Sequence, residues 1–240
     1  MPKRSLYLLA GVIGFFLFIV FSYIVHKNHL TTIDFNFTVR LQNNISTHFN
    51  EPFSFLSEFG KFEVMTVLLL ATFLFAKRIK AGIISLVFFA GFHLIEIYGK
   101  FFVHHPPPPQ FMLRTLDLIP LSTFDVRTQN SYPSGHSARA LFISVILLTL
   151  LWQTDRFSHK TKVILSSAIV VYDILLLLSR VYLGEHWLSD VIGGSLLGSA
   201  FGFFAASFIT PKTYHASAHK HSTEKKSLFP RYKIEIKKVD

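Results

Sequence analysis

Residues 162–209 read KVILSSAIVVYDILLLLSRVYLGEHWLSDVIGGSLLGSAFGFFAASFI. Two apolar runs, 162–182 and 187–209, flank a short segment that contains His186, and Arg180 lies near the end of the first run. Each run approaches the roughly 20 residues that an α-helix needs to cross the hydrocarbon core of a bilayer. The stretch therefore predicts two membrane-spanning helices joined by a short loop at one face of the membrane.

The same pattern continues toward the N-terminus, and half of the 240 residues are hydrophobic. The first apolar run follows Lys3 and Arg4, as in a signal peptide, but its apolar core is too long and no small-x-small cleavage site follows it. We interpret it as a membrane anchor. We therefore predict an all-α fold, an integral membrane bundle of six helices, whose spans are roughly 5–25, 62–76, 81–103, 135–152, 162–182 and 187–209.

The basic residues predict how this bundle is oriented. Of the 24 Lys and Arg residues, 16 fall in segments on the side of the N-terminus and five fall in loops on the other side. The positive-inside rule then places both termini in the cytoplasm and the loops at 26–61 and 104–134 outside. Residues 33–59 of the first outer loop mix aromatic and polar side chains, which predicts an amphipathic helix along the outer interface.

The chain divides into a membrane domain, residues 1–210, and a basic tail, residues 211–240. The composition of the tail predicts disorder and attraction to anionic lipid headgroups. The formal charge of +10 would also suit a nucleic-acid protein. No fold or aromatic platform accompanies that charge, so we predict no nucleic-acid partner. Cysteine is absent, and neither an H-E-x-x-H motif nor an acidic cluster occurs, so we predict no metal and no cofactor.

Polar side chains near membrane helices are energetically costly and are treated as functional by default. In this chain they gather at the predicted outer ends of four helices, which are marked by Lys100, by the segment 132–136, by Ser179 and Arg180, and by His186 and Asp190. Four segments far apart in sequence thus bring cations and imidazoles to one membrane level. This arrangement is the outline of a phosphate site.

Two of these segments have a specific physical use and also a structural alternative. Ser134 and Gly135 open a helix, whose free N–H groups and positive dipole end suit an anion; the alternative is an ordinary capped helix start. His186 and Asp190 are four residues apart and share a helix face. The carboxylate can hold one imidazole nitrogen and leave the other free to attack, or the pair can be simply a helix-start His with a first-turn Asp.

The two cations of the set also have two readings. Arg180 offers a fixed fork of donors to phosphate oxygens, and Lys100 offers a point charge. Taken singly, each side chain could instead extend to the membrane interface. The convergence of all four segments favours the phosphate site.

The motifs resemble those of a known family. Residues 179–190 match S-R-x5-H-x3-D and residues 133–136 match P-S-G-H. Together they resemble the type-2 phosphatidic acid phosphatase superfamily, which includes glucose-6-phosphatases and vanadium haloperoxidases. The resemblance covers the six-span layout and not the tail.

The first motif of that family, K-x6-R-P, is only partly present. Lys100 is followed by FFVHHPPPP, so Pro107 occupies the arginine position. His105, held near Lys100 by the rigid proline run, is our first candidate to replace that arginine, followed by Arg127 and Arg114.

The resemblance implies a role for each matched residue. His186 attacks phosphorus and forms a phosphohistidine, Asp190 orients His186, and His136 protonates the leaving oxygen and then activates water. The phosphoryl oxygens are held by Lys100, Ser134, Gly135 and Arg180.

Three further residues receive predicted roles from their positions. Glu96 lies four residues before Lys100 and can form an ion pair with it. Arg139 lies one turn after His136 and is a candidate phosphate contact. Asp173, two turns inward of Arg180, is expected to be buried and paired.

The leading hypothesis is thus a lipid phosphatase of the membrane, without metal or cofactor, whose site opens at the outer face of a bacterial plasma membrane. Polyprenyl pyrophosphate, phosphatidylglycerol phosphate and phosphatidic acid are all family substrates, and the small six-helix layout with an outward site favours the first. The alternatives are a lipid-to-lipid phosphotransferase that uses the same phosphohistidine, a vanadium haloperoxidase, and a membrane scaffold or transporter. Oligomeric state is not readable from the sequence.

Overall fold

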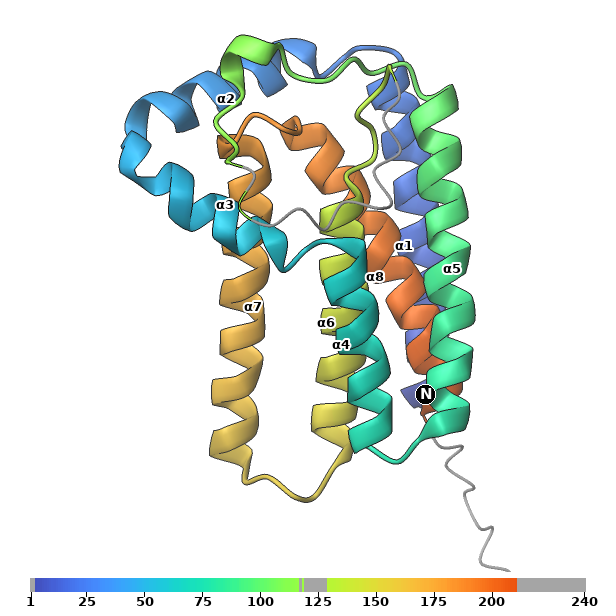
Figure 1. The fold of residues 1–240 in the computed structure, drawn as a ribbon. Coiled ribbons are helices and arrows are strands. Elements are labelled where there is room, and N and C mark those ends of the chain that lie inside the picture. Colours follow the sequence, from blue (N-terminus) through green and yellow to red (C-terminus); the bar gives the residue numbers. More distant parts are fainter. Residues whose placement is uncertain (1–2, 117, 119–128, 211–240) are drawn as a thin grey trace, which may run out of the picture.

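The computed structural model describes residues 3–116, 118 and 129–210, and within these residues every regular element is helical. The predicted all-α fold is therefore confirmed. Six helices run side by side in the bundle of Figure 1, namely α1 (Lys3–His26), α4 (Phe62–Phe75), α5 (Ile79–Phe102), α6 (Gly135–Gln153), α7 (His159–Tyr182) and α8 (Leu188–Ile209).

Five of these six helices are long and apolar enough to cross a membrane. The exception is α4, which has 14 residues. At 1.5 Å per residue such a helix is about 21 Å long, short of a hydrocarbon core of about 30 Å. The predicted second span is thus present at the predicted place as an apolar helix that is shorter than the other five.

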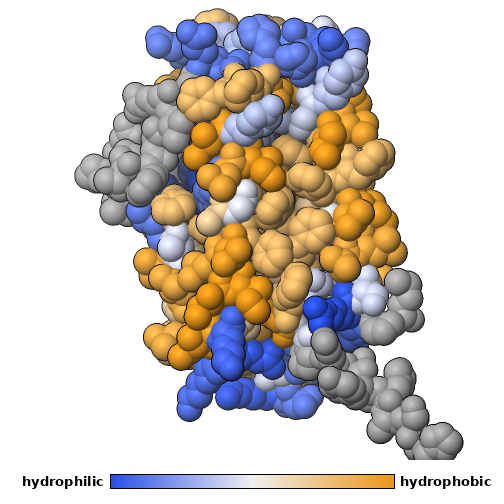
Figure 2. Space-filling view, turned by 90° about the vertical axis from the view of Figure 1, so that its right-hand side faces the viewer, coloured by the Kyte–Doolittle hydropathy of each residue, from blue (hydrophilic) through white to orange (hydrophobic). Residues whose placement is uncertain are grey.

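The outer surface of the bundle is apolar along its length. Phe16 of α1, Val87 of α5 and Ile174 of α7 each leave more than half of their surface exposed. In Figure 2 an apolar band separates hydrophilic side chains at the two ends of the molecule. Such a band would be costly in water, so it is the surface that faces lipid.

The helix α8 is the centre of the bundle and packs against α1, α5 and α6. A Cβ atom added at Gly198 would collide with the carbonyl group of Ala138, so the absence of a side chain lets α6 and α8 approach closely. Around this contact Phe89, Phe92 and Phe142 pack with ring centroids 5.1 to 5.5 Å apart. The middle of α8 is thereby held closely against α6.

Two short helices, α2 (Thr31–Asn44) and α3 (Asn50–Glu58), cross the end of the bundle opposite the N-terminus (Figure 1). The prediction of one amphipathic helix over 33–59 was wrong, because helix α2 ends at Asn44 and Ser46 then caps the 3₁₀ helix η1 (Thr47–Phe49). One face of α2, formed by Asp34, Thr38 and Gln42, is buried. Gln42 donates to the carbonyl groups of Met112, in the 3₁₀ helix η2 (Gln110–Met112), and of Tyr182, at 2.7 and 2.8 Å.

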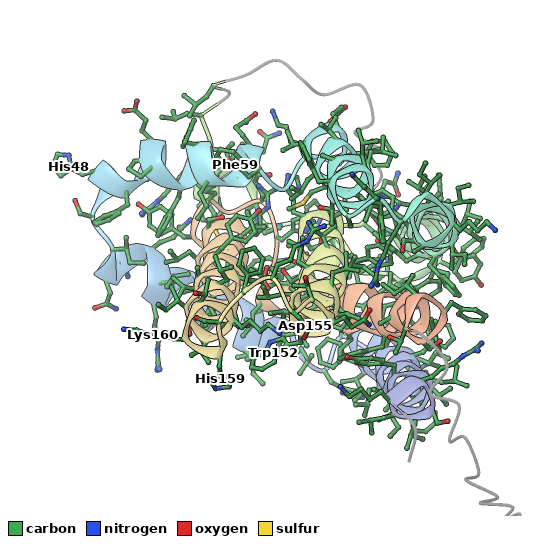
Figure 3. The ribbon with its side chains drawn as sticks, turned by 90° about the horizontal axis from the view of Figure 1, so that it is seen from below. His48, Phe59, Trp152, Asp155, His159 and Lys160 are labelled. Carbon is green, nitrogen blue, oxygen red and sulfur yellow. The ribbon has the colours of Figure 1, made fainter. Side chains whose placement is uncertain are left out.

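The opposite end of the bundle carries the loop between α6 and α7, which is nearest the viewer in Figure 3. There the rings of Trp152 and His159 pack edge to face at 5.6 Å, and Lys162 Nζ lies 5.9 Å from the Trp152 ring. Tryptophan beside basic residues is typical of a membrane–water interface.

Candidate active site

The loop between α7 and α8 positions His186 against Asp190. Nδ1 of His186 lies 3.2 Å from Oδ2 of Asp190, and the same oxygen accepts the backbone N–H of Trp187 at 3.0 Å. Since a carboxylate only accepts, Nδ1 carries the proton and Nε2 keeps its lone pair. Burial, and then the nearby charge of Arg180, lower the pKa of His186 to about 3, so its imidazole is neutral at neutral pH.

Arg180 closes α7 and is 2% exposed. Its guanidinium donates to Oγ of Ser57, which α3 supplies, and to Oε2 of Glu185. Burial would raise the pKa of Glu185, but the charge of Arg180 and the hydrogen bonds from Thr115 and Arg180, with the smaller effect of His186, together outweigh it, so the pKa lies below its ordinary value. Glu185 also accepts a hydrogen bond from Thr115. These partners fix the direction of the guanidinium fork.

A second pair of cations faces one carboxylate. Lys100 Nζ lies 3.6 Å from Oε1 of Glu96, and Nη1 of Arg139 lies 3.7 Å from Oε2. A Cβ atom added at Gly135 would collide with Glu96, so glycine is required where α6 begins beside α5. The structure therefore brings Lys100 and Arg139 together across Glu96, in agreement with the predicted Glu96–Lys100 pair.

The start of α6 is tied to the start of α8. Ser134 caps α6 by accepting the N–H of Ser137 at 3.5 Å, and its own backbone N–H donates to the carbonyl oxygen of Asp190 at 3.0 Å. Nδ1 of His136 lies 3.4 Å from Nη2 of Arg139. Arg139 Nε in turn donates to the carbonyl oxygen of Gly60 at 3.0 Å.

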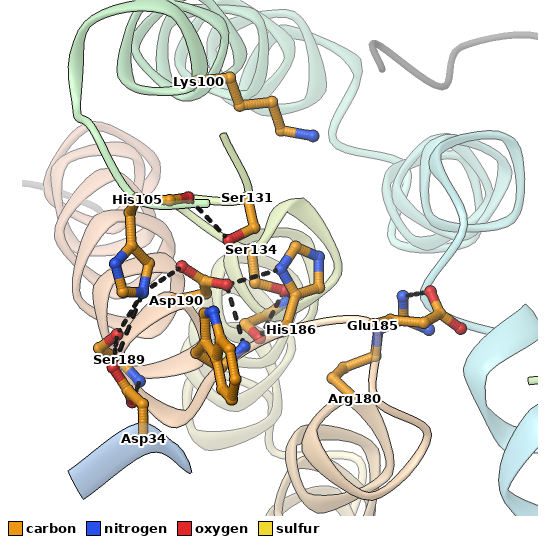
Figure 4. Close-up of polar contacts among 12 residues, drawn as sticks. Asp34, Lys100, His105, Ser131, Ser134, Arg180, Glu185, His186, Ser189 and Asp190 are labelled. Atoms are coloured by element: carbon orange, nitrogen blue, oxygen red, sulfur yellow. Dashed lines mark hydrogen bonds and ion pairs between the residues drawn. The ribbon is translucent and has the colours of Figure 1, made fainter. Parts of the chain in front are cut away.

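Figure 4 shows the convergence of Lys100, Ser134, Arg180 and His186 from α5, the N-cap of α6, α7 and the α7–α8 loop. The groups that can bind an anion thus meet the free nitrogen of His186 in one partly buried site. Fixed cations and N–H groups of this kind can stabilise the charge of a transferring phosphoryl group by position alone.

His105 is not brought to this anion site. Its Nε2 lies 3.0 Å from Oγ of Ser189 and faces Asp34 and Asp190, on the side of Asp190 away from His186 (Figure 4). The chain turns after α5, so residue 105 reaches the space between α2 and α8. His105 therefore faces two carboxylates, and the structure does not support its predicted role as a phosphate contact.

The other two candidates for the missing arginine differ in status. Arg114 donates to the carbonyl oxygen of Gln42 at 3.1 Å and lies over the ring of Tyr182. Arg127 lies outside the described residues. Among the described cations, Arg139 is the one that lies beside both Lys100, across Glu96, and His136.

Sequence reasoning missed Ser57, Asp34 and Glu185. Ser57 and Asp34 belong to helices that look like a surface loop in sequence, and their partners lie more than 120 positions away. Glu185 occupies one of the variable positions of the S-R-x5-H-x3-D motif. A carboxylate next to the expected nucleophile was nevertheless a visible signal. Long-range packing, which no local pattern encodes, supplies the contacts of Ser57 and Asp34.

An apolar cavity of about 470 Å³ lies between α4, α6 and α7. Phe59 lines the cavity at the site end of the bundle, and Leu151 and Leu165 line it toward the opposite end. Its wall includes Ser144, which donates to Oδ1 of Asp173 at 2.9 Å. The expected partner of buried Asp173 is therefore a hydroxyl group. Phe59 is next to Gly60, which packs against the His136 ring, so one end of the cavity lining lies near the site.

Comparisons with known proteins place this geometry in a family. The profile of the PAP2 superfamily matches residues 67–214. An undecaprenyl-diphosphatase of Sulfolobus acidocaldarius is 33% identical over 163 residues, which are 68% of this chain and 71% of that protein. Phosphatidylglycerophosphatase B of Bacillus subtilis is 36% identical over 78 residues, which are 32% of this chain and 38% of that protein.

Two solved structures share the fold. The transmembrane PAP2-type phosphatidylglycerolphosphate phosphatase of Bacillus subtilis superimposes with a TM-score of 0.66 at 24% identity, covering 82% of this chain and 94% of that one. The LpxE protein of Aquifex aeolicus gives a TM-score of 0.54 at 22% identity, covering 72% of this chain and 94% of that one. The family match covers more than half of the residues, it contains the Pro133–His136 and Ser179–Asp190 motifs, and the chain belongs to the PAP2 superfamily.

Proposed function

We propose that this membrane protein hydrolyses the phosphomonoester or pyrophosphate of a lipid through a phosphohistidine on His186. One observation carries the proposal: Asp190 holds Nδ1 of a neutral, buried His186, so Nε2 is free beside the anion-binding groups. Family membership supports the same reaction class.

The reaction would take two steps. In the first, His186 Nε2 forms a bond to phosphorus while the bond to the leaving oxygen breaks, and His136 donates a proton to that oxygen. In the second, His136 takes a proton from water, the water oxygen attacks phosphorus, and the bond to His186 breaks to release inorganic phosphate. The negative charge of both transition states would be held by Lys100, Ser134, Gly135 and Arg180.

Arg139 is our choice for the cation that replaces the missing arginine of the first motif. It shares Glu96 with Lys100 and lies beside His136. A phosphoryl group that displaced Glu96 from both cations would gain two positive partners at once.

A lipid substrate is supported by the apolar cavity between α4, α6 and α7. A hydrocarbon chain in this cavity would enter from the bilayer while its headgroup reached His136 and His186. We favour a polyprenyl pyrophosphate, because the relative matched over most of both chains is an undecaprenyl-diphosphatase. Phosphatidylglycerol phosphate and phosphatidic acid are the other candidates.

The site would open at the outer face of the plasma membrane, since the basic residues place the site end of the bundle outside. No step above uses a metal. The residues 211–240, expected to be a disordered basic tail, lie outside the described residues and have no part in the proposal.

The test is phosphate release by the purified protein in detergent or vesicles, from undecaprenyl pyrophosphate, phosphatidylglycerol phosphate and phosphatidic acid, with EDTA present. We expect turnover that survives EDTA and is inhibited by vanadate, which mimics pentacoordinate phosphorus. Product analysis with a second lipid as acceptor separates hydrolysis from phosphate transfer to that lipid. Loss of activity in EDTA that magnesium restores would refute the metal-independent mechanism.

A further inference from the structure

The carboxylate of Asp190 lies between two imidazoles. Its Oδ2 is 3.2 Å from Nδ1 of His186, and its Oδ1 is 3.5 Å from Nε2 of His105 (Figure 4). The side chain of Asp190 is 0% exposed and that of His105 is 4% exposed. Water therefore solvates neither group, and the electrostatic state of Asp190 depends on the protein groups around it. Besides the imidazoles these are the Ser131 hydroxyl, the backbone N–H of Trp187 and the charge of Lys100.

A second carboxylate approaches the same nitrogen of His105. Oδ2 of Asp34, from α2, lies 3.7 Å from Nε2 of His105. Ser189 Oγ donates its one proton to Asp34 Oδ2 at 2.7 Å and lies 3.0 Å from Nε2 of His105. Because that hydroxyl proton is committed to Asp34, His105 must donate an N–H from Nε2 to Ser189. The imidazole thus presents its N–H toward two buried carboxylates.

The backbone holds His105 in this position. Its N–H donates to Oδ1 of Asn130 at 3.0 Å, and its carbonyl oxygen accepts the N–H of Ser131 at 2.9 Å. The polar and charged groups that face His105 are Asp34 from α2, Ser189 and Asp190 from α8, and the adjacent His104. The charge of Lys100 from α5 acts on Asp190. Burial lowers the pKa of His105 and raises the pKa of Asp34, and the charge of Asp190 works against the first shift.

We propose that His105 is a positioning residue for the nucleophile: its N–H, and its positive charge once it is protonated at acidic pH, keep Asp190 ionised, and Asp190 then holds His186 with Nε2 free. This inference rests on the proposed function, in which His186 attacks phosphorus. Asp34 competes with Asp190 for the same imidazole and so weakens that support. His105 acts through Asp190 and contacts no phosphate.

Two substitutions test the inference by moving the pH profile in opposite directions. His105→Gln keeps an N–H donor at the place of Nε2 but cannot become positively charged. With p-nitrophenyl phosphate as the substrate we expect the acidic limb of kcat to move up by about one pH unit, so kcat measured on that limb should fall about tenfold. KM should stay within about twofold, because no phosphate contact is lost. Asp34→Asn removes the competing charge, so its acidic limb should move to lower pH.

The matched control is His48→Gln, the same substitution at an exposed histidine of η1 that has no contact with the cluster, which should leave the profile unchanged. An increase of KM at constant kcat in His105→Gln would overturn the inference and indicate a phosphate contact instead. Acidic limbs that move in the same direction in His105→Gln and Asp34→Asn would also overturn it. If His105→Gln does not fold, the direction of the Asp34→Asn shift decides alone. A wild-type protein that releases no phosphate from any substrate refutes the proposed function and the inference together, whereas an active wild type with unresponsive variants refutes only the inference.

Discussion

His186 and His136 differ in what surrounds each imidazole, and this difference predicts separable effects of substitution. His186 has a carboxylate on Nδ1, whereas Nδ1 of His136 faces the guanidinium of Arg139. A nucleophile cannot be bypassed, so His186→Ala should be inactive on every substrate. His136→Ala should lose about 10²–10⁴-fold on lipid monophosphates, whose leaving alkoxide needs a proton, and far less on p-nitrophenyl phosphate. Steady-state kinetics on both substrates measure the difference.

Phosphate trapping provides the control for that assignment. With the activated substrate, acid-labile phosphate should accumulate on His186 in the His136→Ala variant, because hydrolysis of the intermediate also needs His136. Asp190→Asn should fall between the two alanine variants, since it still accepts the imidazole N–H but lacks the charge. Phosphate that maps to His136, or turnover by His186→Ala, would show that the roles are reversed.

The residues of the site divide by whether a short motif encodes them. The His186–Asp190 contact follows from a spacing of four on one helix, and the structure has it. The direction of His105 could not be predicted, because it depends on the path of the chain after α5 and on Asn130 and Ser131, which clamp its backbone. Proximity to Lys100 in sequence therefore gave the wrong neighbour for that ring.

The helices α4, α6 and α7 enclose the apolar cavity, and a bulky side chain on its wall should obstruct a lipid tail. Ala168→Trp of α7 places an indole there. We expect kcat/KM for a long-chain lipid phosphate to fall roughly tenfold, the value of a lost hydrophobic pocket contact. Turnover of p-nitrophenyl phosphate, which has no tail, should be nearly unchanged. Comparing the two substrates separates tail binding from general damage.

Ala90→Trp is the matched control for this element. Like Ala168, Ala90 is an exposed alanine on a membrane-spanning helix, but it lies on α5 outside the cavity lining. It should leave both activities intact. Equal losses in the two variants, or a loss on p-nitrophenyl phosphate in Ala168→Trp, would contradict the assignment of the cavity to the lipid tail.

Helix positions were predictable because twenty-residue apolar runs have few other solutions in a membrane, and α5, α6, α7 and α8 begin and end within a few residues of the predicted limits. The cross-bundle helices α2 and α3 were not predictable in the same way. Their mean hydropathy is low. Their inward-facing polar residues, such as Gln42 and Ser57, are hydrogen-bonded to residues of α7 and of η2, which follows α5. A pattern in one segment cannot reveal a partner in another.

The whole molecule has a site end and an opposite end, and the basic residues predict which side of the membrane each faces. Because the chain has no cysteine, a single introduced cysteine reports the side on which it lies. His48 is exposed in η1 at the site end, and Lys160 is exposed at the start of α7 at the other end (Figure 3). A membrane-impermeant maleimide added to intact cells should label His48→Cys. It should label Lys160→Cys only after permeabilisation, because positive charge is retained in the cytoplasm. A reporter fused after Asp240 should likewise be cytoplasmic. The reverse labelling pattern would turn the site toward the cytoplasm, and the substrate would then have to be a lipid phosphate of the inner leaflet.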